Sequence, residues 1–174
     1  PWFMKGVDLL IRAYKEISEK HAGTLRIVGW MSAEDREYLL GLAGNCEQIS
    51  IEVPVFYDEA LSLIDGCEFL VLPSRTEAMG RVLLEAMAFR KAVIASNTDG
   101  IPHYVQNNIN GLLFESGDWK NLQLNLQRLI TDKELSARLA EEGKRLVERC
   151  YSEQVYLNNY IRLIGTQASR KNFC

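Results

Sequence analysis

The chain has 174 residues, of which 47% are hydrophobic, so it can bury a core as a single domain. Its formal net charge of −3, without a basic stripe, argues against a nucleic-acid-binding protein. We find no apolar run long enough to span a bilayer and recognise no signal peptide, so we expect a cytoplasmic location. Membrane association of a longer parent protein is compatible with this sequence but is not encoded in it. The four cysteines lack metal-ligand spacing and are expected to be reduced thiols, and we expect neither a metal nor a cofactor.

The first residues favour a chain that is part of a longer protein. Pro1 is not an initiator residue, and residues 5–8 run directly into an amphipathic helix. A doubly wound domain normally places a strand before such a helix. We therefore expect residues 1–174 to be one domain of a larger polypeptide.

Helical and strand patterns alternate along the chain, read from the spacing of apolar residues and from turn residues. The first half predicts, in order, a helix over 6–20, a strand over 25–28, a helix from the N-cap Ser32 to about Leu42, a strand over 48–53, a short helix capped by Asp58, and a strand over 69–72. The second half predicts a helix over 80–89, a strand over 92–95, a turn over 97–100, a strand over 112–114, and helices over 118–131, 133–149 and 153–164.

Five strands alternating with helices predict an α/β fold, a doubly wound parallel sheet with C-terminal helices. The continuous apolar run at 69–72 is typical of a central strand of such a sheet. Ligands bind this architecture at the carboxyl ends of the strands. Here those ends are the turns after Val28, Val53, Leu72 and Ala95.

The turn at residues 73–80 carries the strongest functional signal, because it follows a predicted strand and opens a helix. The free N–H groups of a helix N-terminus attract phosphate, and Gly80 would let a diphosphate approach the backbone closely. Taken alone, this feature is equally consistent with an ordinary helix start. Arg12, Arg75 and Arg81 are cations that could each reach a phosphate.

Two acids, Glu77 in the turn and Glu85 in the helix, lie eight residues apart. Glu85 stands among apolar residues, where a carboxylate is costly to desolvate unless it is hydrogen-bonded. The pair could bracket a ligand that offers hydroxyls at both ends, since carboxylates accept hydrogen bonds from sugar hydroxyls. The alternative is that Glu85 pairs with an interior Arg or Lys and that Glu77 is only a first-turn acid.

Residues 77–88 resemble the E-x7-E signature of the retaining family-four (group 1) glycosyltransferases with the GT-B fold. Other segments agree in the same order: residues 5–10 with that family's K-G-x-D-x-L opening, 27–29 with its I-V-G turn, 67–74 with its A-D-x-x-x-x-P-S strand, and 92–102 and 110–113 with its later strands. The chain departs from the family pattern at four places. Ala78-Met79 replaces Gly-Phe, Arg90 replaces a Gly, and Asp99 and His103 replace the first Gly and the Glu of G-G-I-P-E.

The resemblance implies a role for each matched residue. Glu77 would be the catalytic residue that binds donor-sugar hydroxyls, and Glu85 would bind the ribose hydroxyls of the nucleotide. Backbone amides would hold the diphosphate, Lys5 would neutralise its charge, Val55 would contact the base through its backbone, and Gly29 would line the cleft. The residues that would supply those amides are Ala78, Met79, Gly80, Arg81 and Val82.

The implied function is that of the donor-binding half, Rossmann-like, of a retaining glycosyltransferase. It would move a hexose-type sugar from a nucleoside-diphosphate sugar to an acceptor hydroxyl in polysaccharide or glycoconjugate synthesis. Residues 153–174 would cross toward an absent N-terminal acceptor domain, and this chain alone would be inactive. The alternatives are another GT-B-type nucleotide-sugar enzyme, such as an epimerase, and a non-catalytic doubly wound binding module.

Overall fold

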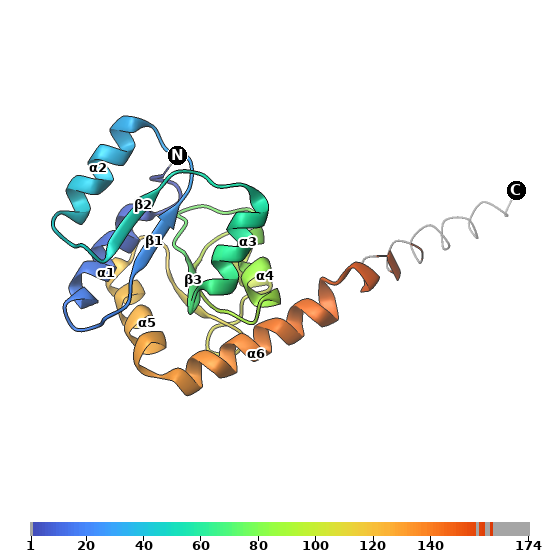
Figure 1. Ribbon diagram of the computed structural model, residues 1–174. Coiled ribbons are helices and arrows are strands. Elements are labelled where there is room, and N and C mark those ends of the chain that lie inside the picture. The colour runs from blue at the N-terminus through green and yellow to red at the C-terminus, as the bar shows by residue number, and fades with distance from the viewer. Residues whose placement is uncertain (1, 156, 159–160, 162–174) are drawn as a thin grey trace, which may run out of the picture.

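The computed structural model describes residues 2–155, 157–158 and 161, and it has the predicted α/β architecture (Figure 1). In chain order the elements are α1 Val7–Ser18, β1 Leu25–Val28, α2 Ala33–Ala43, β2 Ile49–Glu52, α3 Tyr57–Gly66, β3 Phe69–Leu72, α4 Arg81–Ala88, β4 Ala92–Asn97, the 3-10 turn η1 Ile101–His103, β5 Leu112–Glu115, α5 Trp119–Thr131 and α6 Lys133–Cys150. All strand pairs are parallel.

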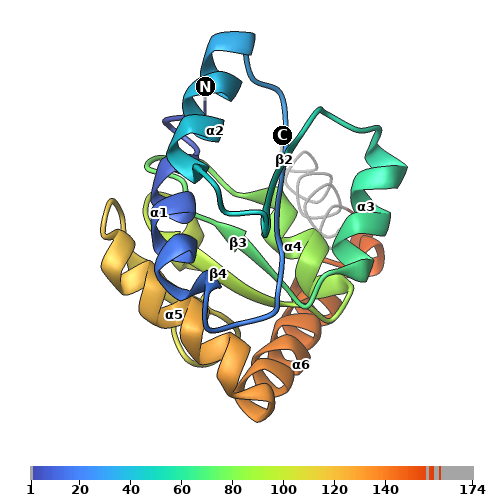
Figure 2. The same ribbon diagram turned by 60° about the vertical axis from the view of Figure 1, so that its left-hand side comes forward.

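Helices cover both faces of the strands, with α1 and α5 on one side and α3, α4 and α6 on the other (Figure 2). The alternation of side chains along β4 explains this arrangement, because successive residues of a strand point to opposite faces. Ala92 and Ile94 pack into the core formed with α1 and α5, whereas Val93 and Ala95 pack into the core beneath α4. All four are buried. The prediction of a doubly wound fold is therefore confirmed.

The hydrogen bonding of the strands differs from the single parallel sheet that we expected. β1 pairs with β2, and β3-β4-β5 form a separate ladder, with no backbone pairing between β1 and β3 among the described residues. Ile27 of β1 and Phe69 and Val71 of β3 nevertheless belong to one apolar cluster. β3 is thus an edge of its ladder, and its four residues are only partly buried. The expectation that residues 69–72 form a central strand is wrong in this respect.

Most helix boundaries agree with the sequence pattern, but one cap does not. The Ser32 side chain accepts a hydrogen bond from the Asp35 N–H at 3.1 Å, as an N-cap should. Asp58 was expected to cap α3, yet the extended residue Phe56 holds that position without a side-chain bond. Asp58 lies two residues after the cap, in the first turn, where its negative charge interacts favourably with the positive end of the helix.

The last predicted helix is only partly described. Residues 153–155, 157–158 and 161 are helical, and the remainder of 153–174 lies outside the described residues. Within the described part of the chain, no helix is long and apolar enough to cross a membrane.

Candidate functional site

The predicted site residues gather at the edge of the fold where the parallel strands end. Gly29 follows β1, Val55 follows β2, and the loop over 73–80 joins β3 to α4. A side chain at Gly29 would meet nothing within 4 Å, so this turn faces open space. Val55 is half-buried beside α3. These positions satisfy the rule that places ligands at the carboxyl ends of parallel strands.

An ion pair between Asp8 and Arg75 fastens the N-terminal turn to the loop after β3. The guanidinium donates to both carboxylate oxygens at 2.8 Å and to the Phe3 carbonyl at 2.6 Å, and it stacks 4.0 Å from the centre of the Phe3 ring. The Arg75 N–H also bonds the Met4 carbonyl at 2.8 Å. The charge of Arg75 is therefore committed to Asp8. The guanidinium that could reach a phosphate is thus already paired with a carboxylate.

Gly6 lets the same turn lie directly against the loop. Its φ is 66°, in the left-handed region that favours glycine. A Cβ at this position would lie 1.9 Å from the Pro73 carbonyl oxygen. No residue other than glycine fits this contact, which sets the distance between Lys5 and the loop that carries Glu77.

Lys5 and Glu77 form a second ion pair, with 2.5 Å between Nζ and Oε2. The Ser74 hydroxyl lies 3.4 Å from the same oxygen. Burial raises the pKa of the Glu77 carboxyl, but the hydrogen bond and charge of Lys5, together with the Gly80 N–H, outweigh it and hold that pKa below 4.5. Glu77 is therefore ionised at neutral pH. Its side chain is 14% exposed and that of Lys5 is 56% exposed, so the pair remains open to solvent.

The mouth of α4 offers backbone donors beside this pair. Gly80 precedes the helix with a φ of 64°, and the first N–H groups of any helix lack an intrahelical partner. Ala78 and Met79 are exposed, and the Gly80 N–H is turned onto the Glu77 carboxylate. Arg81 and Val82 begin the helix. Backbone donors at a helix N-terminus are a common anion-binding feature, and anion binding by this segment stays a prediction.

Glu85 does not lie in the apolar surroundings that its sequence neighbours suggest. Helical periodicity turns Leu83, Leu84, Ala86 and Met87 into the core and leaves Glu85 on the outer face with Arg81. The Arg81 Nε lies 3.2 Å from the carboxylate, and the Tyr57 hydroxyl donates to it at 3.2 Å. The Arg81 side chain is 77% exposed, so the alternative of an interior cation is wrong. The contact with Tyr57 brings the segment after β2 against α4.

Three residues at this edge were not singled out as site residues from the sequence. Asp8 is one, and Asp99 is another, since its carboxylate accepts hydrogen bonds from the Thr76 hydroxyl and the Glu77 N–H. The third is Tyr104, whose hydroxyl donates to the Met79 and Gly80 carbonyls. The pKa of the Tyr104 phenol is raised by burial and by the charge of Glu77. A local sequence pattern gives no sign of these contacts, because the partners are far apart in the chain.

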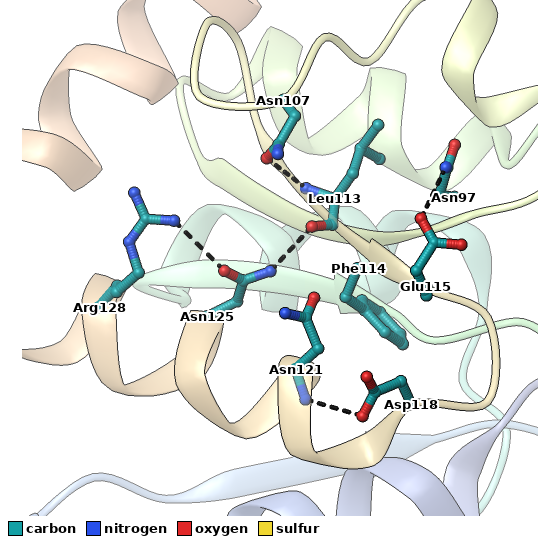
Figure 3. Close-up of a pocket in the computed structure, with 9 residues that line it drawn as sticks. All are labelled: Asn97, Asn107, Leu113, Phe114, Glu115, Asp118, Asn121, Asn125 and Arg128. Atoms are coloured by element: carbon teal, nitrogen blue, oxygen red, sulfur yellow. Dashed lines mark hydrogen bonds between the residues drawn. The ribbon is translucent and has the colours of Figure 1, made fainter.

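A cavity of about 380 Å³ lies elsewhere, between β5 and α5 (Figure 3). It is lined by Asn97, Asn107, Leu113, Phe114, Glu115, Asp118, Asn121, Asn125 and Arg128. The Asn107 and Asn125 amides bond the backbone N–H and carbonyl of Leu113, so they cover the outer edge of β5. None of the predicted site residues lines this cavity. Within the described part of the chain, no cluster of His, Cys, Asp and Glu is arranged to hold a metal ion.

Comparison with known proteins shows the family of this chain. The sequence pattern of the family described as Glycosyl transferases group 1 matches residues 3–146. An uncharacterized glycosyltransferase from Methanocaldococcus jannaschii is 33% identical over 145 residues, which cover 83% of this chain and 40% of that protein. The chain spans about two fifths of the length of the curated relatives that it matches.

Solved structures give the same result. The C-terminal domain of a group 1 glycosyltransferase, LpcC from Francisella tularensis, superposes with a TM-score of 0.78 and 28% identity, covering 86% of this chain and 81% of that one. Anabaena HepE, solved with UDP-glucose, shares the fold with a TM-score of 0.77 and 22% identity over 95% of this chain and 46% of that one. From the match over residues 3–146 and these likenesses, we conclude that the chain belongs to the group 1 glycosyltransferases.

Proposed function

We propose that this chain is the donor-binding half of a retaining glycosyltransferase. It would bind a nucleoside-diphosphate sugar, from which a hexose-type sugar passes to an acceptor hydroxyl in polysaccharide or glycoconjugate synthesis. The observation that carries the proposal is the solvent-accessible Lys5–Glu77 pair beside the N-terminus of α4. Glu85 lies one turn further along the same helix. HepE, which shares the fold, was solved with UDP-glucose, and this supports a nucleotide sugar as the ligand.

Binding of the donor would exchange the partners of the two charged groups. The diphosphate would lie against the amides from Ala78 to Val82 and draw the Lys5 ammonium away from Glu77, because two phosphates carry more charge than one carboxylate. The freed Glu77 carboxylate would then accept hydrogen bonds from sugar hydroxyls. Glu85 would bind the ribose hydroxyls. Val55 would lie near the base, and Gly29 would line the cleft beside the donor.

The main contribution of this domain to the reaction would be to stabilise the leaving group, more than to supply acid–base chemistry. The bond between the anomeric carbon and the diphosphate oxygen breaks, and its electron pair leaves with the nucleoside diphosphate. The acceptor oxygen forms the new bond to that carbon, and the hydroxyl proton is released. Lys5 and the backbone donors of α4 would stabilise the charge that develops on the departing diphosphate. Contacts with base and ribose would hold the anomeric carbon in place.

We further propose that the acceptor is held by an N-terminal domain of the same polypeptide and that residues 153–174 cross toward that domain. The chain alone would then bind the donor weakly and transfer nothing. A cytoplasmic location stays a prediction.

Isothermal titration with UDP, GDP, ADP and their glucose derivatives tests the donor site. We expect dissociation constants of about a millimolar or below for at least one pair. Glu85→Gln should weaken the binding of the nucleotide and of the nucleotide sugar alike, because Glu85 would contact the ribose that both ligands contain. Glu77→Gln should weaken the binding of the nucleotide sugar only. Glu141 is an exposed acid on α6, and Glu141→Gln should change neither affinity. Absence of binding by every member of the panel at millimolar concentration would refute the proposal.

A further inference from the structure

We infer that Asp99 is a positioning residue that holds Glu77 in place for the donor sugar, an inference that rests on the proposed function. Asp99 lies in the turn after β4 and reaches across to the loop before α4. Its Oδ2 accepts the Glu77 N–H at 2.8 Å and the Thr76 hydroxyl at 2.7 Å. A carboxylate that accepts two such bonds fixes the loop more firmly than a neutral acceptor would.

The turn after β4 holds both peptide groups of Glu77. Asp99 accepts its N–H, and the Gly100 N–H donates to its carbonyl at 3.3 Å. The backbone of Glu77 is thereby fixed on both sides, and the direction of its side chain follows from the backbone. That direction brings the Glu77 carboxylate to Lys5 and to the Ser74 hydroxyl.

The backbone of Asp99 adopts a conformation that favours glycine. Its φ is 44°, in the left-handed region, which few residues other than glycine enter without a cost. Aspartate is among the residues that tolerate this region, and the two hydrogen bonds of its side chain offset the cost. Those bonds also lower the pKa of the Asp99 carboxyl, so that it stays ionised and accepts both donors. A residue whose only task was to form the turn would be served better by glycine.

Two effects of Asp99 must be separated by experiment, namely forming a turn and positioning Glu77. A role in the turn alone would leave the preference for a sugar on the nucleotide unchanged. A positioning role would change that preference, because Glu77 contacts the sugar whereas the diphosphate and ribose are held by other groups. The useful quantity is therefore the ratio of the dissociation constants for a nucleoside diphosphate and for its glucose derivative.

The test compares the 174-residue wild-type chain with Asp99→Gly and Asp99→Asn. The matched control is Asn108→Gly, because Asn108 also has a positive φ, of 62°, and its side chain also accepts a hydrogen bond, from Arg128. Titration with the panel above gives the ratio for the pair that the wild type binds best. Amide hydrogen exchange of Glu77, followed by NMR without ligand, reports directly on its bond to Asp99.

In Asp99→Gly we expect the affinity for the nucleotide sugar to fall by about tenfold, with less than about a twofold change for the nucleotide alone. Exchange of the Glu77 amide should become faster in the same variant. Asp99→Asn keeps an acceptor oxygen and should restore most of both properties, and Asn108→Gly should alter neither.

An Asp99→Gly variant that keeps the wild-type ratio, or in which Glu77 exchanges no faster, would overturn the inference and leave the proposed function intact. A wild-type chain that binds no member of the panel would overturn the proposed function and this inference with it.

Discussion

Two bidentate ion pairs of nearly the same geometry should contribute very differently to stability, because they differ in burial. Arg75 contacts both oxygens of Asp8 at 2.8 Å, and Arg26 contacts both oxygens of Glu52 at 2.8 and 2.6 Å. In the first pair the side chains are 21% and 9% exposed, and in the second they are 51% and 29% exposed. The chain thus offers a natural experiment on the effect of solvent on an ion pair.

The substitutions Asp8→Asn and Glu52→Gln remove one charge each and preserve shape. Loss of a partner from a buried pair costs about 3–5 kcal/mol, whereas an exposed pair contributes about 0.2–1 kcal/mol. Arg75 keeps its contacts with the Phe3 carbonyl and ring and retains some solvent, so we expect a loss of about 2–3 kcal/mol for Asp8→Asn. For Glu52→Gln we expect less than about 1 kcal/mol.

The pKa of Glu52 points in the opposite direction from its exposure. Hydrogen bonds from Arg26 and Ser50 lower that pKa from 4.5 to about 2, which by itself would suggest that the Glu52 pair is strong. Because both partners are in contact with water, solvent and salt screen much of this interaction. For Asp8, burial raises the pKa, and the hydrogen bonds and charge of Arg75 outweigh it and hold the pKa below 3.8.

The sign of the pH dependence is the same for both acids. Each folded-state pKa is depressed, so each contribution to stability is complete above the unfolded-state pKa and is lost as the pH falls through the folded-state pKa.

Urea unfolding at pH 7, with and without 1 M NaCl, measures the stability lost in Asp8→Asn and in Glu52→Gln. Salt should reduce the cost of Glu52→Gln and affect that of Asp8→Asn far less. A cost for Glu52→Gln equal to or larger than that for Asp8→Asn would refute the reasoning from burial.

Three further substitutions test other parts of the structure. Arg90 has a φ of 55°, and among the described residues its side chain forms an ion pair with Glu141 alone, at the surface. Arg90→Gly should therefore relieve its conformation and raise the free energy of unfolding by about 0.5 kcal/mol. Ala88→Gly in the neighbouring helix should lower it by about 1 kcal/mol, and a loss in both would contradict this account. Tyr104→Phe removes the hydroxyl that bonds the carbonyls at the mouth of α4 and should cost about 1–2 kcal/mol in thermal or urea unfolding. An unchanged midpoint would show that these bonds contribute little.

The elements that local patterns encode were predicted well. The apolar run of β4, the amphipathic spacing of α1 and the glycine before α4 are short-range signals, and the fold class follows from their alternation. The resemblance to a family implied that Lys5 and Glu77 belong to one site, but their direct ion pair was not predicted. It did not follow from the spacing, because 72 residues separate the two.

Two of the features that were not predicted, the pairing of Arg75 and the order of the strands, depend on contacts between distant segments. Nothing near Arg75 indicates that Asp8 would hold it. The missing ladder between β1 and β3 concerns the order of strands, which single-strand patterns do not specify. Glu85 was judged by its neighbours in sequence, although a helical projection would have placed it on the outer face with Arg81.

The interruption between the two strand ladders has a mechanical consequence. No backbone pairing joins β1 to β3 among the described residues, so separating the β1-β2 pair from the other strands breaks no hydrogen bond between strands. Opening of the molecule under heat or force should begin along this seam, since cooperative units separate where few bonds cross between them. The proposed site would then divide, because Gly29 and Val55 follow β1 and β2, while the loop around Glu77 would stay attached to the larger unit.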